Sequence, residues 1–386
     1  MGNRILGLIM ISILLIIIDI YIYRAVQSVS WKWKNNKYLS FTYIWWGYTL
    51  LLIIGVFISI FFNIKFLLRS IILVVFFLTF VSKIFILPFL ITDDLRRGLI
   101  WIKRKLKSKP RDQNSVDSTN KENIPRSEFI IKAGTLVAAL PLASLTYGVV
   151  SSAYDYRIKR KTIFLPNLPK AFDGITLGQL SDIHSGSFYD KNAVLGGVEM
   201  LLKEKPELVF FTGDLVNNLA SEMRDYQDIF SKVKAPLGVY SILGNHDYGD
   251  YFFGKGNSTA KSKNLADVKI THKNMGWDLL LNENRRIKIE GEEIAILGIE
   301  NWGANLHFPK YGKLHDAYQN INPEHFKILM SHDPSHWEAE VIPKYPEVQL
   351  MLSGHTHGMQ FGLENPYFKW SPVQWVYKQW AGMYQT

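Results

Sequence analysis

Residues Gly244-Asn245-His246-Asp247 follow directly after an apolar run, 238–243, that reads as a β-strand. Four further polar motifs stand at the ends of apolar runs in the same half of the chain. They are Asp182-Ile183-His184, Gly213-Asp214, Ser331-His332 and Gly354-His355-Thr356-His357. Carboxylate, amide and imidazole groups are ligands of divalent cations, and a pair of cations needs about eight of them, with one carboxylate shared. The five motifs therefore predict a site for two metal ions.

The sequence around these motifs alternates between short apolar runs and segments with helical periodicity. The predicted strands are 174–180, 208–212, 238–243, 293–299, 326–330 and 348–352. The predicted helices between them are 191–205 and 221–234. Strands that are apolar on both faces and separated by helices are typical of layered α/β domains, which bind ligands at the carboxyl ends of the strands. We therefore expect an α/β catalytic domain over 152–386.

The N-terminal part of the 386-residue chain is far more apolar. Its long apolar runs are 5–23, about 42–62, about 70–92 and about 130–150. A helix of about 20 residues crosses the hydrocarbon core of a bilayer, so each run is a candidate membrane span. The first run is longer than the core of an ordinary signal peptide, and further spans follow it. The sequence predicts three transmembrane helices in 1–92, a basic cytoplasmic linker in 93–128 and a fourth transmembrane helix in 129–151.

The net charge of +10 belongs to the membrane part. Residues 1–151 hold 19 Lys and Arg against 7 Asp and Glu, whereas 152–386 hold 25 against 27. This distribution disfavours nucleic acid as a partner. Ten basic residues lie between the third and fourth runs and four between the first and second, which makes these two loops cytoplasmic by the positive-inside rule. We expect a multi-pass protein of the cell membrane with an extracytoplasmic catalytic domain.

Some titratable residues fall outside the motifs. Asp19 lies near the end of its apolar run and Lys83 can extend towards the membrane surface, so we interpret both as structural rather than functional. Five histidines match no motif and are interpreted as surface or structural residues. They are His272, His307, His315, His325 and His336.

The five motifs, in this order, resemble those of the calcineurin-like metallophosphoesterase family over about residues 160–380. The resemblance implies a four-layer α-β-β-α sandwich that binds two divalent metal ions, Mn, Fe or Zn, with Mn favoured. It also implies which residues bind each ion. The first ion takes Asp182, His184 and His357, the second takes Asn245, His332 and His355, and Asp214 bridges the two.

Phosphoester hydrolysis is the activity that the resemblance implies. Two cations about 3.5–4 Å apart hold a hydroxide between them and neutralise the phosphoryl oxygens that would repel it. His246 would stabilise a phosphoryl oxygen or protonate the departing alkoxide, which suits an imidazole whose pKa is near neutrality. Asp247 would orient that imidazole. The predicted catalytic residues are therefore His246 and Asp247.

Within the family, the chain is similar to a membrane-linked bacterial branch that includes UDP-2,3-diacylglucosamine hydrolases. This similarity implies a phosphorylated substrate at the membrane, either a lipid-linked compound or a small molecule. Two features depart from the pattern of the branch. Met359 stands where the branch usually has Gly, and the chain stops at Thr386, where the family domain normally continues with further strands. We therefore expect a short or truncated C-terminal end and a less stable second sheet.

Three alternatives stay open at this stage. The chain could be a membrane sensor or transporter whose outer domain binds a phosphate compound, a protein phosphatase with the same metal core, or a relative that has lost its metal ions. Apolar spans with few polar residues disfavour transport, His246 disfavours a pure binding protein, and the complete ligand set disfavours a metal-free relative. The motifs specify the reaction centre but not the leaving group, and the sequence does not indicate the oligomeric state.

Overall fold

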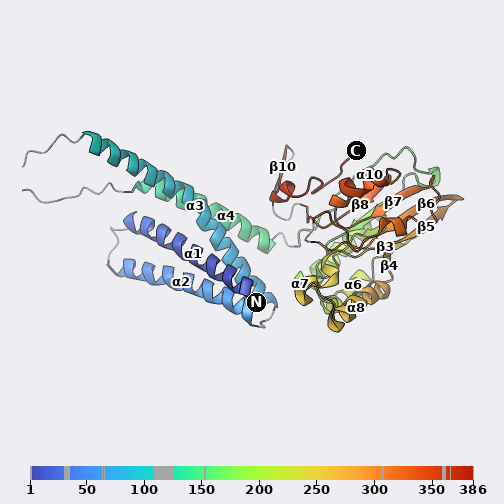
Figure 1. Ribbon diagram of the computed structural model, residues 1–386, viewed down its shortest axis with the longest axis horizontal. Coiled ribbons are helices and arrows are strands. Elements are labelled where there is room, and N and C mark those ends of the chain that lie inside the picture. Colours follow the sequence, from blue (N-terminus) through green and yellow to red (C-terminus); the bar gives the residue numbers. More distant parts are fainter. Residues whose placement is uncertain are drawn as a thin grey trace, which may run out of the picture. The chain divides into compact units, whose positions relative to one another are not determined.

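A computed structural model of the chain divides into two compact units, Met1–Asp155 and Tyr156–Thr386 (Figure 1). The structure describes residues 2–29, 35–62, 64, 66–107, 126–151, 154–305, 308–358, 362, 363–365 and 367–385. Two residues discussed above lie outside these ranges. They are His307, which was interpreted as a surface or structural residue, and Met359, which stands in place of a glycine.

The first unit consists of long apolar helices. They are α1 (Gly2–Val29), α2 (Asn35–Phe61), α3 (Phe66–Lys107) and α4 (Glu128–Ser151). Each is long and apolar enough to cross a membrane. Helices α1, α3 and α4 share a buried apolar core that includes Ile18, Ile86 and Ile131. Gly134 allows α4 to approach α3 closely, because a Cβ atom there would lie 2.8 Å from Phe89 Cβ.

Helix α3 is longer than the predicted span, since residues 93–107 of the expected linker are helical. Salt bridges one turn apart support this extension, with Arg96 3.0 Å or less from Asp93 and Arg97 3.1 Å from Asp94. The Asp93 carboxylate also accepts the backbone N–H of Ser127 at 3.0 Å, at the start of α4. The rest of the predicted linker, 108–125, lies outside the described residues.

Asp19 and Lys83 form an ion pair between two helices, a contact that was not predicted from the sequence. Helix α1 continues ten residues past Asp19 to Val29, so Asp19 lies inside the helix, and its side chain is fully buried. Its Oδ1 lies 2.5 Å from Lys83 Nζ on α3, and its Oδ2 accepts a hydrogen bond of 2.5 Å from Thr49 on α2. A charge within apolar helices is stable when it is paired in this way, and the pair links three helices.

The second unit contains two four-stranded sheets. The first sheet is parallel, in the order β1-β2-β3-β4, with β1 at Leu177–Leu180, β2 at Leu208–Phe211, β3 at Val239–Ser241 and β4 at Asp278–Leu279. The second has the order β5-β6-β7-β8, with β5 at Glu283–Ile289, β6 at Glu292–Gly298, β7 at Phe326–Met330 and β8 at Leu350–Leu352. In the second sheet only the pair β5-β6 is antiparallel.

Residues on alternate sides of each strand explain how the sheets pack. In β2, Leu208 and Phe210 join Ile296 and Ile328 of the second sheet in one buried core. Phe211 points to the other side of β2, where its ring lies 5.7 Å from that of His272. Because successive side chains of a strand face opposite ways, both faces of the sheet are covered.

Helices form the two outer layers. Those beside the first sheet are α5 (Lys191–Lys203), α6 (Gln227–Phe230) and α8 (Thr259–Met275), and the short helix α7 (Asp250–Phe253) precedes α8 in the chain. The second sheet packs against α9 (Leu314–Ala317) and a π-helical turn, Trp337–Val341, that leads into α10 (Ile342–Lys344). The predicted α/β fold, a four-layer α-β-β-α sandwich preceded by apolar helices, is confirmed.

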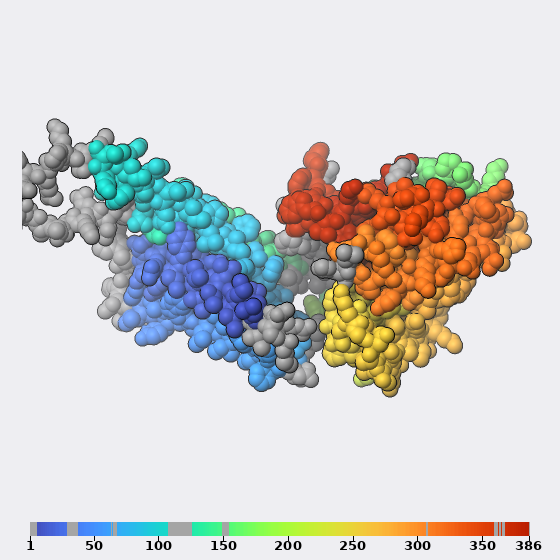
Figure 2. Space-filling model, in the orientation of Figure 1, coloured from blue at the N-terminus to red at the C-terminus, as the bar shows by residue number. Residues whose placement is uncertain are grey.

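The C-terminal residues continue beyond the second sheet. A small antiparallel hairpin is formed by β9 (Leu363–Asn365) and β10 (Phe368–Trp370), and a 3₁₀ turn follows at Pro372–Trp375. In the space-filling view these red segments lie beside the orange segments of the second sheet (Figure 2). We expected a less stable second sheet, and in the structure this sheet has four strands.

Candidate metal centre

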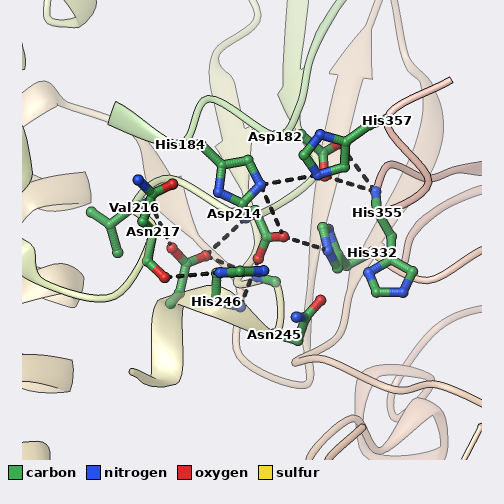
Figure 3. Close-up of polar contacts among 12 residues, drawn as sticks. Asp182, His184, Asp214, Val216, Asn217, Asn245, His246, His332, His355 and His357 are labelled. Carbon is green, nitrogen blue, oxygen red and sulfur yellow. Dashed lines mark hydrogen bonds and ion pairs between the residues drawn. The ribbon is translucent and has the colours of Figure 1, made fainter. Parts of the chain in front are cut away.

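The five motifs meet at the carboxyl ends of the strands (Figure 3). Asp182 follows β1, Asp214 follows β2 and Asn245 follows β3, all from the first sheet. From the second sheet, His332 follows β7, and His355 and His357 follow β8. The centre is therefore built where the carboxyl ends of strands from the two stacked sheets meet.

The backbone is bent sharply at these positions. Five residues of the motifs have a positive φ, between 45° and 69°, and they are Asp182, His184, Asp214, His355 and His357. Residues other than glycine rarely adopt this left-handed backbone conformation. It costs about 1–3 kcal/mol per residue and is concentrated at functional sites. The turn at Gly213 also requires glycine, because a Cβ atom there would lie 2.6 Å from the backbone nitrogen of Gly244. The bent turns direct the polar side chains towards one another.

The first group of ligand atoms belongs to Asp182, His184, Asp214 and His357. One atom from each lies within 4.8 Å of the others. His184 Nε2 is 3.1 Å from His357 Nε2 and 3.5 Å from Asp214 Oδ2, and His357 Nε2 is 3.6 Å from Asp182 Oδ1. Two imidazole nitrogens and two carboxylates that converge in this way can bind one divalent cation.

The second group shares Asp214 with the first. It brings Asp214 together with His332 and His355, and His332 Nε2 lies 3.1 Å from Asp214 Oδ2. Asp214 Oδ2, His332 Nε2 and Asn245 Oδ1 are buried and have no hydrogen-bond partner among the described residues. The amide nitrogen of Asn245 donates to Tyr251 at 3.1 Å, which turns its oxygen away from that hydroxyl. The orphaned atoms have the chemistry of cation ligands, so the residues fit a second ion beside the first.

Charge is shared unevenly within the centre. Burial alone would raise the pKa of the Asp214 carboxyl, but the facing imidazoles of His332, His246 and His184 lower it overall. Burial alone would lower the pKa of His332, yet the Asp214 carboxylate raises it to about 10. Burial and then the neighbouring His332 lower the pKa of His355 to about 3. A negative carboxylate among imidazoles attracts positive charge, whether it comes from protons or from metal ions.

His246 lies beside the ligands. Its backbone N–H donates to Asp214 Oδ1 at 2.8 Å, and its Nδ1 lies 2.8 Å from the carbonyl oxygen of Asn217. Its ring packs against His184 at 4.7 Å and Tyr251 at 4.6 Å between centroids. Because a carbonyl oxygen accepts a hydrogen bond, Nδ1 carries the proton and Nε2 is the nitrogen left for chemistry.

The role predicted for Asp247, which was to orient His246, is corrected by the structure. The buried Asp247 carboxylate accepts four backbone N–H groups at 2.8–3.2 Å, from Asp214, Leu215, Val216 and Gly244. Asn217 orients the imidazole in its place. Burial and the charge of Asp214 raise the pKa of Asp247 to about 7. Asp247 therefore connects the turns that follow β2 and β3 and positions Asp214 through its backbone.

Two tyrosines at the centre were not predicted from the sequence. Tyr251 contacts Asn245 and His246, and Tyr377 places its hydroxyl 2.7 Å from His355 Nε2. Neither tyrosine stands in a motif, and no periodicity marks them. Of the histidines outside the motifs, His272 and His336 are fully buried and each contacts a serine hydroxyl at 3.0 Å, so they are structural.

A sandwich of two sheets with aspartate, asparagine and histidine at its strand ends defines a metal-dependent phosphoesterase domain. The sequence matches two family models, one described as calcineurin-like phosphoesterase over residues 175–359 and one described as probable calcineurin-like phosphoesterase, transmembrane domain, over residues 3–153. The chain belongs to the calcineurin-like phosphoesterase family, whose members hydrolyse phosphoester bonds.

Several relatives are similar to part of the sequence. The chain is 30% identical over 251 residues to a transmembrane protein with metallophosphoesterase domain from Danio rerio, covering 61% of this chain and 54% of the relative. It is 30% identical over 261 residues to the uncharacterized metallophosphoesterase YkuE of Bacillus subtilis, covering 66% and 83%. It is 28% identical over 274 residues to the UDP-2,3-diacylglucosamine pyrophosphatase LpxG of Chlamydia trachomatis, covering 61% and 79%. The match thus spans about half of the Danio rerio protein and most of the bacterial ones.

Proposed function

We propose that the chain is a membrane-anchored phosphoesterase that uses two divalent metal ions. The observation that carries this proposal is the shared Asp214, which belongs to both groups of ligand atoms. We assign Asp182, His184 and His357 to the first ion and Asn245, His332 and His355 to the second. Manganese is the favoured metal, with iron and zinc as the alternatives.

The chemistry of such a pair defines the roles of the residues. Bound divalent ions supply an activated water molecule and positive charge for the phosphoryl oxygens. His246 lies at the edge of the ligand groups and is oriented by Asn217, so its Nε2 faces the reaction and, in the doubly protonated ring, can donate to the phosphoryl group or to the leaving oxygen. Asp247 holds the turn that carries Asp214. The residues can therefore both bind the ions and complete proton transfer.

A substrate at the lipid surface fits the architecture best. The last apolar helix ends at Ser151 and the catalytic unit begins at Tyr156, so only a short connection joins them. The relative from Chlamydia trachomatis is named for a diacylated sugar nucleotide. We propose a lipid-linked phosphomonoester or phosphodiester as the substrate class, with water-soluble phosphoesters as the class to be excluded.

The test uses the full-length protein in detergent micelles, loaded with Mn²⁺. It is assayed against phosphomonoesters, phosphodiesters and nucleotide-lipids, each in an acylated and a deacylated form. We expect metal-dependent hydrolysis with a preference for the acylated form. Absence of hydrolysis by protein that has bound two ions would refute the proposed activity, and equal rates on the two forms would refute the lipid substrate.

We propose that the catalytic unit faces away from the cytoplasm. The support is the excess of basic residues in the loops assigned to the cytoplasm. The chain has no cysteine, so single cysteines report topology without background. With a membrane-impermeant maleimide applied to intact cells, Lys232→Cys in the catalytic unit should be labelled and Lys103→Cys should not. The reverse pattern would turn the catalytic unit inward and leave the metal chemistry unaffected.

A further inference from the structure

The imidazole of His355 lies between the ligand groups and the C-terminal segment. One side of its ring faces His332, with ring centroids 5.1 Å apart and planes at 74° (Figure 3). Its Nε2 faces the other way and lies 2.7 Å from the hydroxyl oxygen of Tyr377. The Tyr377 ring stands edge-on to the imidazole at 5.3 Å and 80°. The two nitrogens of His355 therefore have different surroundings.

This arrangement decides which nitrogen can bind an ion. An imidazole ligand offers one nitrogen to the metal and donates the N–H of the other to an acceptor, which fixes its tautomer and its orientation. In His332 the acceptor is the carbonyl oxygen of Thr212, 2.7 Å from Nδ1, and Nε2 faces Asp214. In His355 the roles of the nitrogens are exchanged, because Nε2 faces Tyr377 and Nδ1 is left for the metal.

We infer that Tyr377 is a positioning residue for the second metal ion, because its hydroxyl accepts the Nε2 proton of His355 and leaves the Nδ1 lone pair directed at the ion. This inference rests on the proposed metal centre and adds a residue that lies outside the matched catalytic model, which ends at residue 359. It makes the C-terminal segment part of the metal site.

The segment that carries Tyr377 is held firmly on the turn that contains His355. Thr356, the next residue of that turn, donates its hydroxyl to the carbonyl oxygen of Trp380 at 2.7 Å. The residues between these contacts, Lys378 and Gln379, both bond the Glu338 carboxylate, at 2.9 and 2.8 Å. Two successive residues of the Gly354-His355-Thr356-His357 motif are thus bonded to one segment, which fixes the position of the Tyr377 hydroxyl.

A second acceptor lies near the same nitrogen but is less well placed. Asp333 Oδ2 is 3.6 Å from His355 Nε2, beyond the distance of a hydrogen bond. Its other oxygen, Oδ1, accepts the backbone N–H of Ser335 at 2.8 Å, which holds the carboxylate in the turn that follows β7. Tyr377 is therefore the hydrogen-bond partner of Nε2, and Asp333 is the competing partner that an experiment must separate from it.

The test compares three variants of the full-length protein by Mn²⁺ binding in equilibrium dialysis. Tyr377→Phe removes only the hydroxyl, and Asp333→Asn keeps the shape of the competing acceptor. Tyr384→Phe is the matched control, because it removes a hydroxyl from the same segment. Among the described residues, that hydroxyl bonds the backbone N–H and carbonyl oxygen of Ala381. Melting temperatures in excess chelator check that each variant is folded.

We expect Tyr377→Phe to weaken the binding of one of the two ions about 10- to 100-fold, the usual effect of losing such a partner, and to leave the other ion unchanged. Tyr384→Phe should bind both ions as the wild type does. If Tyr377→Phe also binds both ions normally, or if only Asp333→Asn weakens binding, the inference is overturned. The readout does not depend on turnover, so a wild-type protein that binds two ions without hydrolysing any substrate would refute the proposed function and not this inference.

Discussion

Each unit of the chain buries a carboxylate, and the two carboxylates are compensated in different ways. Asp19 in the membrane unit has a lysine ammonium 2.5 Å from one oxygen and a threonine hydroxyl 2.5 Å from the other. Asp214 in the catalytic unit has the backbone N–H of His246 on Oδ1, but no hydrogen-bond donor on Oδ2 among the described residues. The imidazoles of His332 and His184 face that oxygen at 3.1 and 3.5 Å.

This difference distinguishes a carboxylate with a structural role from one that can bind metal ions. A buried charge that is neutralised by the chain itself links helices and is complete without a ligand. A buried carboxylate surrounded by imidazoles and an amide oxygen, all of which can donate electron pairs, is complete only with cations. The number of buried charges does not distinguish a structural carboxylate from a metal ligand. The partners of each carboxylate oxygen do distinguish them.

The largest effect is expected from removing the shared carboxylate. Asp214→Asn replaces the shared carboxylate with a neutral amide that has only one oxygen, so we expect loss of both ions and a fall in turnover of several orders of magnitude. Metal content after dialysis and the rate of hydrolysis are measured together. The exposed Asp225→Asn is the control, since its carboxylate only pairs with Lys191 at 3.1 Å. An Asp214→Asn protein with two ions and normal turnover would contradict the bridging role.

The next effect concerns the residue beside the ligands. His246→Ala should retain both ions and lose about 10²- to 10⁴-fold in rate, because it removes one group that acts in proton transfer. The loss should be smaller for a nitrophenyl ester, whose leaving group needs no proton. Parallel losses of metal and of rate would show that His246 serves binding instead.

Breaking the pair in the membrane unit should affect stability and leave the chemistry intact. Lys83→Met leaves the Asp19 charge buried without its partner, which we expect to cost about 3–5 kcal/mol in unfolding free energy, and adding Asp19→Leu should restore most of it. Thermal unfolding in detergent measures the change, with the exposed Lys132→Met as the control. Metal content should stay at the wild-type value. If Lys83→Met unfolds as the wild type does, the pair does not stabilise the helices.

The smallest effect tests a buried histidine that is not at the metal centre. Burial lowers the pKa of His272 to about 3, so it stays neutral in the folded protein and takes up a proton only after unfolding. The unfolded chain then binds more protons below pH 6.5, and stability falls with decreasing pH by up to about 1.4 kcal/mol per unit from this residue.

The measurement for His272 compares pH series of unfolding in excess chelator. His272→Phe should show a shallower decline between pH 6.5 and pH 4 than the wild type. The exposed His315→Gln should follow the wild type. Equal slopes for His272→Phe and the wild type would mean that His272 is protonated in the folded protein.

The sequence predicted the parts of the fold in which local pattern and final environment agree. The apolar runs before Asp214 and Asn245 are largely buried parallel strands, so their composition marks them. Strand β5, Glu283–Ile289, was not predicted because it lies at the edge of its sheet and most of its residues are charged. Helix α8, Thr259–Met275, was not predicted because its polar residues lack a clear apolar face.

Contacts between distant residues explain what was missed at the sites. The pairing of Asp19 with Lys83 and of His355 with Tyr377 depends on how helices and turns pack, which one sequence does not reveal. The role of Asp247 was misread because its partners are backbone N–H groups, which every residue carries. The motifs predicted which residues come together at the centre, whereas the residues that orient them could not be predicted.

The origin of the ligands in both sheets has a consequence for the fate of the protein in a cell. Ions bound at the proposed centre would connect Asp214, which follows a strand of one sheet, to His332, which follows a strand of the other. Ligands that bind only the folded state stabilise it by about 2.7 kcal/mol at a hundred times their dissociation constant. We therefore expect scarcity of the metal to lower the abundance of the protein as well as its activity, since the unfolded chain is exposed to proteolysis. The supply of metal would then determine the amount of protein that escapes proteolysis.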